Sequence, residues 1–181
     1  MPCFAPYRGF IEYAEIGRYD LTDRGERFDI RQIERTIAHP QWDGKIPYND
    51  IMVVQLETPV DTPVIEINRD ENLPSESGDE LFVLGFGNTV ADPLNVQLAD
   101  VLQEIETEYI PFESCSVASD LETGESYGDS QSGQSAVTDD WLCTLANDPR
   151  RGNCVGDAGG PVIKKGSNSS NEDILVGVVV R

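Results

Sequence analysis

An all-β fold is the class that this sequence of 181 residues predicts, and three observations lead to it. Short apolar segments recur along the chain, and several alternate apolar with polar residues, which is typical of strands. Stretches rich in Gly, Pro, Ser and Asp separate these segments. Hardly any stretch has the period of a helix. The length suffices for one sizeable domain or two small packed halves.

The first half of the chain contains three expected strands and a connector. Residues 10–17 (FIEYAEIG) alternate partly, and residues 27–40 (RFDIRQIERTIAHP) carry four apolar residues among polar ones before a His-Pro stop. Residues 50–56 (DIMVVQL) are almost continuously apolar, as in a strand buried on both faces. Residues 58–67 (TPVDTPVIEI) contain two prolines and predict a connector that leads into an edge strand.

The second half continues the strand pattern. Residues 80–87 (ELFVLGFG) predict a buried strand that ends in glycines, and residues 141–145 (WLCTL) and 174–180 (ILVGVVV) predict two more. The start of residues 98–111 (LADVLQEIETEYIP) is compatible with a helix, but alternation further along favours a strand. Residues 119–140 are rich in Ser, Gly and Asp and predict a long surface loop.

Composition excludes several classes of function. The formal net charge of −20, from 33 acidic and 13 basic residues, opposes binding to nucleic acid or to anionic membranes. No run of 18 apolar residues occurs, so no transmembrane helix is expected. The four cysteines form no CxxC pair and His39 is the single histidine, so we expect no metal site. The segment GFGNTV lacks the third glycine and the following helix of a dinucleotide site, and we expect no cofactor.

The cysteines favour an oxidising compartment, whereas the first residues lack the pattern of a secreted protein. Four cysteines in an acidic chain rich in Gly and Pro favour disulfides and an oxidising compartment. The first residues have no basic segment followed by an apolar one, so we expect no signal peptide among them.

Several motifs are weak separately but specific in their order. The segments IAHPQW, NDIMVVQL, GFGNT, LQEIETEYIPFESC, WLCTL, CVGDAGGPVI and LVGVVV follow one another along the chain. In this order they resemble the trypsin- and chymotrypsin-like serine proteases over roughly residues 10 to 181. The resemblance implies two packed antiparallel β-barrels with an active site between them. Residues 1–62 would form what this chain contains of the first barrel. Residues 63–74 would connect the two barrels, and residues 75–181 would form the second barrel, which is truncated.

The resemblance also assigns the catalytic positions. The family uses a Ser-His-Asp triad in which serine attacks the scissile carbonyl, histidine takes its proton and a buried aspartate orients the histidine. Asp50 matches the aspartate, whereas the serine position of the GDSGGP motif is Ala158. The catalytic histidine is missing, since Cys3 matches the cysteine that follows it. His39 matches a non-catalytic residue and is expected to be a turn or surface histidine.

Other residues of the same motif carry further implied roles. The backbone N–H groups of Gly156 and Ala158 match the oxyanion hole, which does not depend on side chains. Asp157 matches the carboxylate that pairs with a new N-terminal amine in an activated protease. Without an IVGG-like segment to supply that amine, we expect a solvated or disordered loop around Asp157. Gly152 matches the floor of the primary specificity pocket, where glycine gives no support to a trypsin-type preference.

The resemblance pairs only two of the four cysteines. Cys115 and Cys143 match a disulfide of the second barrel. Cys3 and Cys154 match half-cystines whose partners would lie outside this chain, so the first barrel is expected to be incomplete at its N-terminus and the second at its C-terminus. Asn168 begins an Asn-Ser-Ser pattern, which is a candidate glycosylation site.

Two hypotheses about function remain open. The first is a monomeric, secreted pseudoprotease that binds a protein or peptide partner through the cleft or the loop 119–140. The second is a truncated or altered chain of an otherwise active secreted serine endopeptidase. Ala158 favours the first, because truncation does not change an internal residue.

Overall fold

The computed structural model describes residues 11–42, 49–90, 95–118, 140–148, 152, 155–166 and 172–180. Within these ranges the chain forms nine strands and a single short helix. The elements in chain order are β1 (Tyr13–Ile16), β2 (Asp29–Ala38), β3 (Met52–Leu56), β4 (Glu66–Ile67), β5 (Glu80–Gly85), β6 (Gln103–Ile110), α1 (Phe112–Cys115), β7 (Cys143–Ala146), β8 (Pro161–Lys164) and β9 (Ile174–Val178). The all-β prediction is therefore confirmed.

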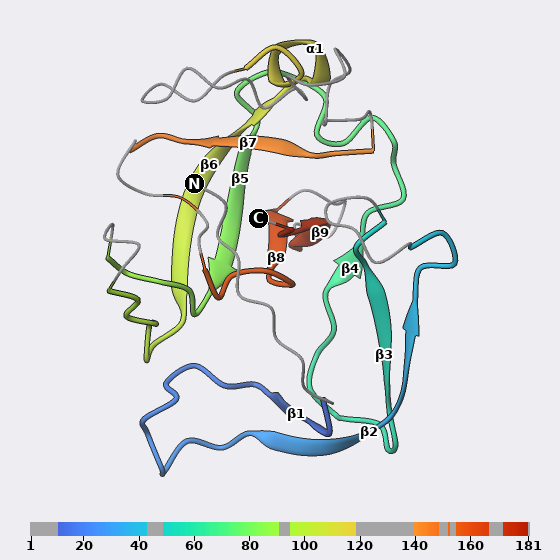
Figure 1. Ribbon diagram of the computed structural model, residues 1–181, viewed down its shortest axis with the longest axis vertical. Coiled ribbons are helices and arrows are strands. Elements are labelled where there is room, and N and C mark those ends of the chain that lie inside the picture. Colours follow the sequence, from blue (N-terminus) through green and yellow to red (C-terminus); the bar gives the residue numbers. More distant parts are fainter. Residues whose placement is uncertain are drawn as a thin grey trace.

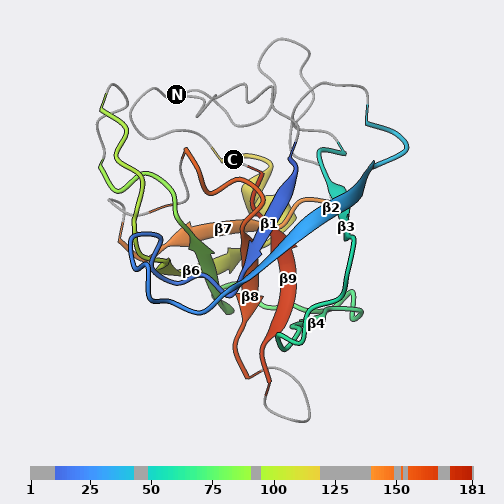
Figure 2. The same ribbon diagram turned by 90° about the horizontal axis from the view of Figure 1, so that it is seen from below.

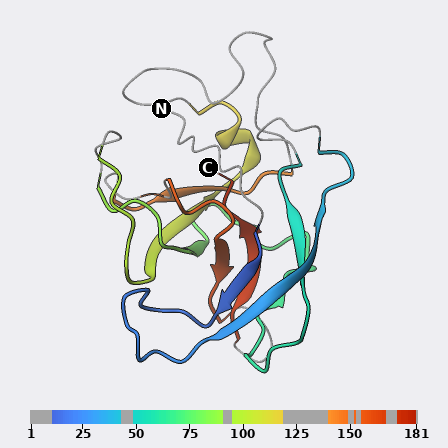
Figure 3. The ribbon, with the colours of Figure 1, turned by 60° about the horizontal axis from the view of Figure 1, so that its bottom comes forward.

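The strands are arranged in two sheets. One has three strands in the order β1-β2-β3, and the other has six in the order β4-β9-β8-β5-β6-β7. All neighbours are antiparallel except β4 and β9, which are parallel. Figures 1 and 3 show the blue and teal strands of the small sheet beside the larger sheet. Residues 98–111, for which a strand was favoured over a helix, supply the eight-residue strand β6.

The core of the described residues belongs to the six-stranded sheet. Leu81 is fully buried, and it packs with Val83, Val162 and Val179 in one apolar cluster. Leu81 and Val83 lie on β5 and Val162 lies on β8, and these two strands pair with each other. The apolar run of residues 80–87 thus forms a buried strand as predicted.

The three-stranded sheet differs from the prediction for residues 50–56. The expectation that this run is buried on both faces is wrong, because Val53 is 63% exposed and Met52 49% exposed. A strand is buried on both faces only where other layers cover both of them. Among the described residues, none of the buried apolar side chains lies on β1, β2 or β3. The described part of the chain therefore does not cover both faces of this sheet.

A loop between β1 and β2 connects the two sheets. Asp20 forms an isolated antiparallel bridge with Val101, just before β6. The Leu21 N–H donates to the Asp100 carbonyl, and the Leu102 N–H donates to the Tyr19 carbonyl. These main-chain hydrogen bonds attach the loop of the small sheet to the larger sheet.

The side chains of the same loop hold its shape. The Arg18 guanidinium lies 4.1 Å from the centre of the Phe28 ring and forms ion pairs with Glu15 and Glu26. The Glu26 carboxylate also accepts hydrogen bonds from the Tyr19 and Asp20 N–H groups. The loop therefore keeps the conformation in which its main chain reaches residues 100–102.

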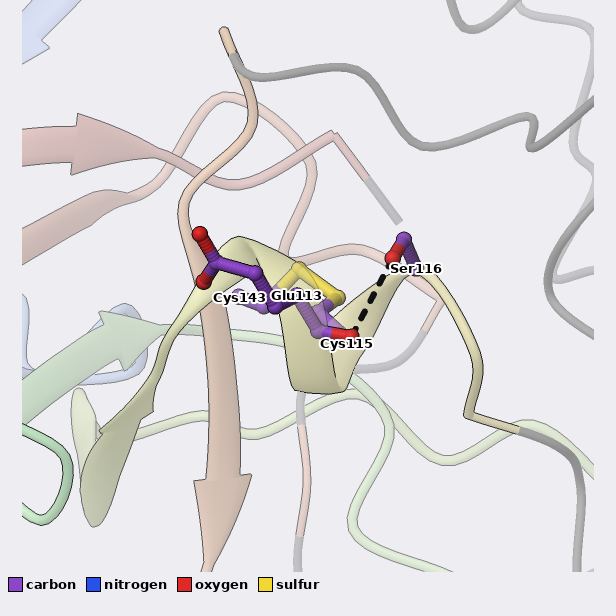
Figure 4. The surroundings of a disulfide bond; sticks show 4 residues. All are labelled: Glu113, Cys115, Ser116 and Cys143. Carbon is purple, nitrogen blue, oxygen red and sulfur yellow. Dashed lines mark hydrogen bonds between the residues drawn. A yellow bond between two sulfur atoms is a disulfide. The ribbon is translucent and has the colours of Figure 1, made fainter.

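A disulfide joins the short helix to the sheet. Cys115 at the end of α1 is bonded to Cys143 at the start of β7, across a sequence separation of 28 residues. Figure 4 shows this bond beside the hydrogen bond that Ser116 donates to the Glu113 carbonyl. The pairing that the resemblance implied for Cys115 and Cys143 is confirmed.

The segment expected to connect two barrels contributes to the larger sheet. Residues 66 and 67 form β4 at the edge of the six-stranded sheet, as expected for an edge strand. Leu73 and Pro74 are joined by a cis peptide bond shortly before β5. The division of the chain into halves at residues 63–74 stays a prediction.

An ion pair fixes the turn that leads into β5. Lys164 Nζ on β8 donates to Asp79 Oδ1 at 2.8 Å, and the Ser75 and Glu76 N–H groups donate to Asp79 Oδ2. The Lys164 hydrogen bond, helped by the two N–H groups against partial burial, lowers the pKa of Asp79 below the usual 3.8. The ionised carboxylate is thus favoured in the folded state.

Replacement of this carboxylate, Asp79→Asn, is expected to lower the unfolding free energy by about 1 kcal/mol near neutral pH. Because folding lowers this pKa, the contribution is complete above 3.8 and is lost as the pH falls through the folded value. Thermal melting of both proteins between pH 7 and pH 3 measures the difference. Equal melting temperatures near pH 7, or a difference that grows towards pH 3, would contradict this assignment.

Candidate active-site turn

The turn of residues 155–160 immediately precedes β8 and is held by main-chain hydrogen bonds. The Asn88 N–H donates to the Val155 carbonyl at one end of the turn. At the other end the Gly159 N–H donates to Val179, and the Val179 N–H donates to Gly160. The turn is thus fixed between the loop after β5 and the residue that follows β9.

Three glycines allow the main chain to follow this path. Gly156 and Gly159 have φ angles of 98° and 87°, a region that glycine occupies without steric cost. At Gly160 a Cβ would lie 2.6 Å from the Leu84 carbonyl oxygen, so the close approach of two main-chain segments requires glycine. These requirements account for the glycine-rich character of residues 156–160.

The Asp157 side chain attaches the turn to the loop that follows β5. Its side chain is buried, and Oδ1 accepts a hydrogen bond of 2.8 Å from the Gly87 N–H. A Cβ on Gly85 or Gly87 would overlap this carboxylate, so both glycines are needed to make room for it. The expectation of a solvated or disordered loop around Asp157 is wrong, because a main-chain donor compensates the buried carboxylate.

Gly85 and Gly87 were not predicted from the sequence as parts of this site. Gly87 and Asp157 are separated by 70 residues in sequence, so no local pattern links them. The paired glycines of the GFG segment were the available signal, since glycine inside a strand often marks a close approach by another group.

Ala158 stands at the exposed tip of the turn. Its methyl group is neither a nucleophile nor a proton donor. The N–H groups of Gly156 and Ala158 donate no hydrogen bond to the described residues. The turn can therefore offer two main-chain donors to an acceptor from outside, but no reactive side chain.

The other predicted catalytic position lies just before a strand of the small sheet. Asp50 precedes β3 and is exposed, whereas the resemblance implies a buried aspartate. Within the described residues no hydrogen bond or ion pair connects Asp50 to the turn that carries Ala158. The structure thus gives no contact that would make these two residues one catalytic unit, and the role of Asp50 stays a prediction.

His39 takes part in a turn between β2 and β3. Its N–H donates to the Ile51 carbonyl, and its Nδ1 accepts a hydrogen bond of 3.3 Å from the Gln41 N–H. The Trp42 N–H in turn donates to the His39 carbonyl. The side chain therefore stabilises the local turn, as expected for a turn histidine.

The remaining predicted positions are only partly visible. Gly152 is exposed, but its neighbours are not described, so its place in a specificity pocket stays a prediction. Cys3, Cys154 and Asn168 lie outside the described residues. Where the structure does describe the chain, no group of three His, Cys, Asp or Glu side chains could hold a metal ion, and no helix is long and apolar enough to cross a membrane.

Comparison with known proteins decides the family. The family model described as Trypsin matches residues 12–180, which is nearly the whole chain. The chain belongs to the trypsin family. The match of Ala158 to the nucleophile position of this family stays a prediction.

Curated relatives agree with this membership. The trypsin-family chain is 27% identical to kallikrein 1-related peptidase b16 of Mus musculus, over 87% of this chain and 59% of the relative. It is 29% identical to kallikrein-1 of the same species, over 83% and 56%. It is 27% identical to trypsin II-P29 of Gallus gallus, over 88% and 58%. The chain thus spans less than two thirds of the length of these relatives.

Proposed function

We propose that this trypsin-like serine protease domain is a pseudoprotease, which binds a protein or peptide partner without hydrolysing it. The observation that carries the proposal is Ala158 at the tip of a turn that main-chain hydrogen bonds hold at both ends. The methyl group of alanine cannot form the acyl-enzyme through which a serine protease acts.

The remaining parts of the turn do not replace the nucleophile. Removal of triad members from serine proteases leaves only about 10³- to 10⁴-fold acceleration over water, which comes from the oxyanion hole and binding. An acceleration of that size is negligible for peptide-bond hydrolysis. Two N–H donors without a nucleophile support binding of a peptide carbonyl and do not support its cleavage.

The net charge and the disulfide support a proposal for the location of the protein and for its kind of partner. We propose an extracellular location, which the bond between Cys115 and Cys143 supports because disulfides persist in oxidising compartments. The net charge of −20 opposes nucleic acid as a partner and favours solubility as a monomer. A protein or peptide partner would bind at the cleft or at the loop 119–140.

A second candidate is an altered chain of an otherwise active secreted endopeptidase, in which alanine has replaced the serine at position 158. The retained N–H donors of Gly156 and Ala158 favour it, because they match an oxyanion hole. The coding DNA decides between the candidates. An alanine codon at 158 in the natural gene supports the pseudoprotease, and a serine codon supports the altered peptidase.

Hydrolysis of fluorescein-labelled casein tests the proposed function. The purified chain is expected to release no fluorescence above buffer, with an active trypsin as the positive control. The variant Ala158→Ser is also expected to be inactive in this chain of 181 residues, because its single histidine, His39, is engaged with Gln41. Casein hydrolysis by the unmodified chain would refute the pseudoprotease, whereas hydrolysis by the variant alone would refute only the argument about histidine.

A further inference from the structure

The outer edge of the six-stranded sheet offers main-chain groups without partners. β4 is the terminal strand of this sheet and pairs with β9 on one side only. The Asn68 N–H donates to Leu175 of β9, and in a parallel ladder alternate residues point the opposite way. The N–H and C=O of Ile67 therefore point away from β9. No described residue bonds to them. Figure 2 shows β4 next to β9 at this edge.

The same edge exposes large apolar side chains. Val64 is 89% exposed and Ile67 is 59% exposed, and Ile65 between them is also exposed. Natural proteins usually protect sheet edges with charged side chains, prolines or a covering loop. Pro63 precedes these residues, but the described part of the chain places no cover over Ile67. Exposed apolar side chains beside free main-chain groups are features of a binding edge.

A surface cavity of about 360 Å³ lies next to this edge. Ile67, Leu73 and the buried Ile174 provide its apolar lining. The polar wall is pre-organised, because the Asn68 side chain donates to the Asp70 and Leu73 carbonyls and accepts from the Asp70 N–H. A side chain that enters this cavity would meet a rigid wall, which limits the entropy lost on binding.

Arg69 is the basic residue among those that line the cavity. It lines the cavity together with Glu66 and Asp70. Asp70 Oδ1 accepts hydrogen bonds from the N–H and the side-chain amide of Asn72, and Glu66 also takes part in an interaction within the protein. Within the described part of the chain the Arg69 side chain forms no hydrogen bond or ion pair, although the sequence has 33 acidic residues. Its guanidinium is thus available to a carboxylate from a partner.

We propose that an extended peptide segment of a partner binds at the outer edge of β4 as an additional strand and places an acidic side chain next to Arg69. An extended segment matches this edge because it can accept from the Ile67 N–H and donate to the Ile67 carbonyl at the same time. A helical partner cannot, since its main-chain groups are bonded within the helix. Alternate side chains of the added strand would enter the cavity, which gives specificity. The proposal does not depend on the turn that carries Ala158.

Selection from a displayed library of random dodecapeptides tests the proposal. The library is selected on the chain of 181 residues, and the enriched peptides are synthesised with a fluorophore for binding by fluorescence polarisation. We expect enriched peptides with an Asp or Glu among β-branched or aromatic residues. Ile67→Pro, which removes the outward N–H but no ladder hydrogen bond, should weaken their binding at least 10-fold. Arg69→Glu should weaken it at least 10-fold as well.

Matched variants separate binding from folding. Ile67→Val retains the N–H and an apolar β-branched side chain, so it should restore most of the binding that Ile67→Pro loses. Arg24→Glu makes the same change of charge in the loop between β1 and β2 and should leave binding unchanged. Circular dichroism melts of all variants show whether each is folded. A peptide that binds Ile67→Pro and Arg69→Glu as well as the unmodified protein, or a library without enriched peptides, would overturn the proposal.

Discussion

Removal of the disulfide, by Cys115→Ala together with Cys143→Ala, is expected to lower the free energy of unfolding by about 3–4 kcal/mol. The bond closes a sequence separation of 28 residues, and this cross-link restricts the unfolded chain more than the folded one. A loss of that size is a large part of the 5–15 kcal/mol that stabilises most folded proteins. Urea unfolding followed by circular dichroism measures the loss.

The neighbouring substitution Ser116→Ala serves as the control for this disulfide. It removes an exposed hydrogen bond to the Glu113 carbonyl and should change the stability by no more than about 0.5 kcal/mol. If the double alanine variant unfolds within about 1 kcal/mol of the unmodified protein, the unfolded-chain model of this cross-link is contradicted. A similar loss in Ser116→Ala would show that the helix end, and not the disulfide, is sensitive.

The substitution Gly87→Ala is expected to destabilise the protein by at least about 2 kcal/mol, because overpacking in a filled region forces main-chain shifts. The added Cβ would overlap the Asp157 carboxylate, which accepts the Gly87 N–H hydrogen bond. Displacement of Asp157 would also disturb the turn at Gly156 and Ala158. Thermal melting, together with amide chemical shifts of residues 156–160, reports both effects.

Gly152→Ala is the matched control for Gly87→Ala. A Cβ at Gly152 would meet no atom within 4 Å, so this variant should melt within about 0.5 kcal/mol of the unmodified protein. Equal stability of the two alanine variants would contradict the role of Gly85 and Gly87 as the space that admits Asp157.

Apolar runs in the sequence predict buried strands only where the core lies beside them. The apolar runs at residues 80–87 and 174–180 contribute buried side chains, such as Leu81 and Ile174, because β5 and β9 belong to the sheet that carries the core. The equally apolar run at 50–56 forms β3, yet Val53 is exposed. A run of apolar residues shows that burial is favourable, but it cannot show which other segments are present to cover it.

The candidate site was predictable only where its residues are close in sequence. The turn around Asp157 and the alanine at its tip follow from one short motif. The contact between Asp157 and Gly87 joins segments 70 residues apart, and only the packed structure shows it. The pairing of Cys115 with Cys143 followed from resemblance to a family, since four cysteines permit three complete pairings.

Reaction with a fluorophosphonate probe tests the central claim of a protease fold without its nucleophile most directly. These probes bond covalently to the activated serine of serine hydrolases. The intact mass of the purified chain should be unchanged after incubation with the probe under conditions that label an active trypsin completely, because Ala158 has no hydroxyl group. Stoichiometric labelling of one serine in the folded chain, lost on denaturation, would contradict the account.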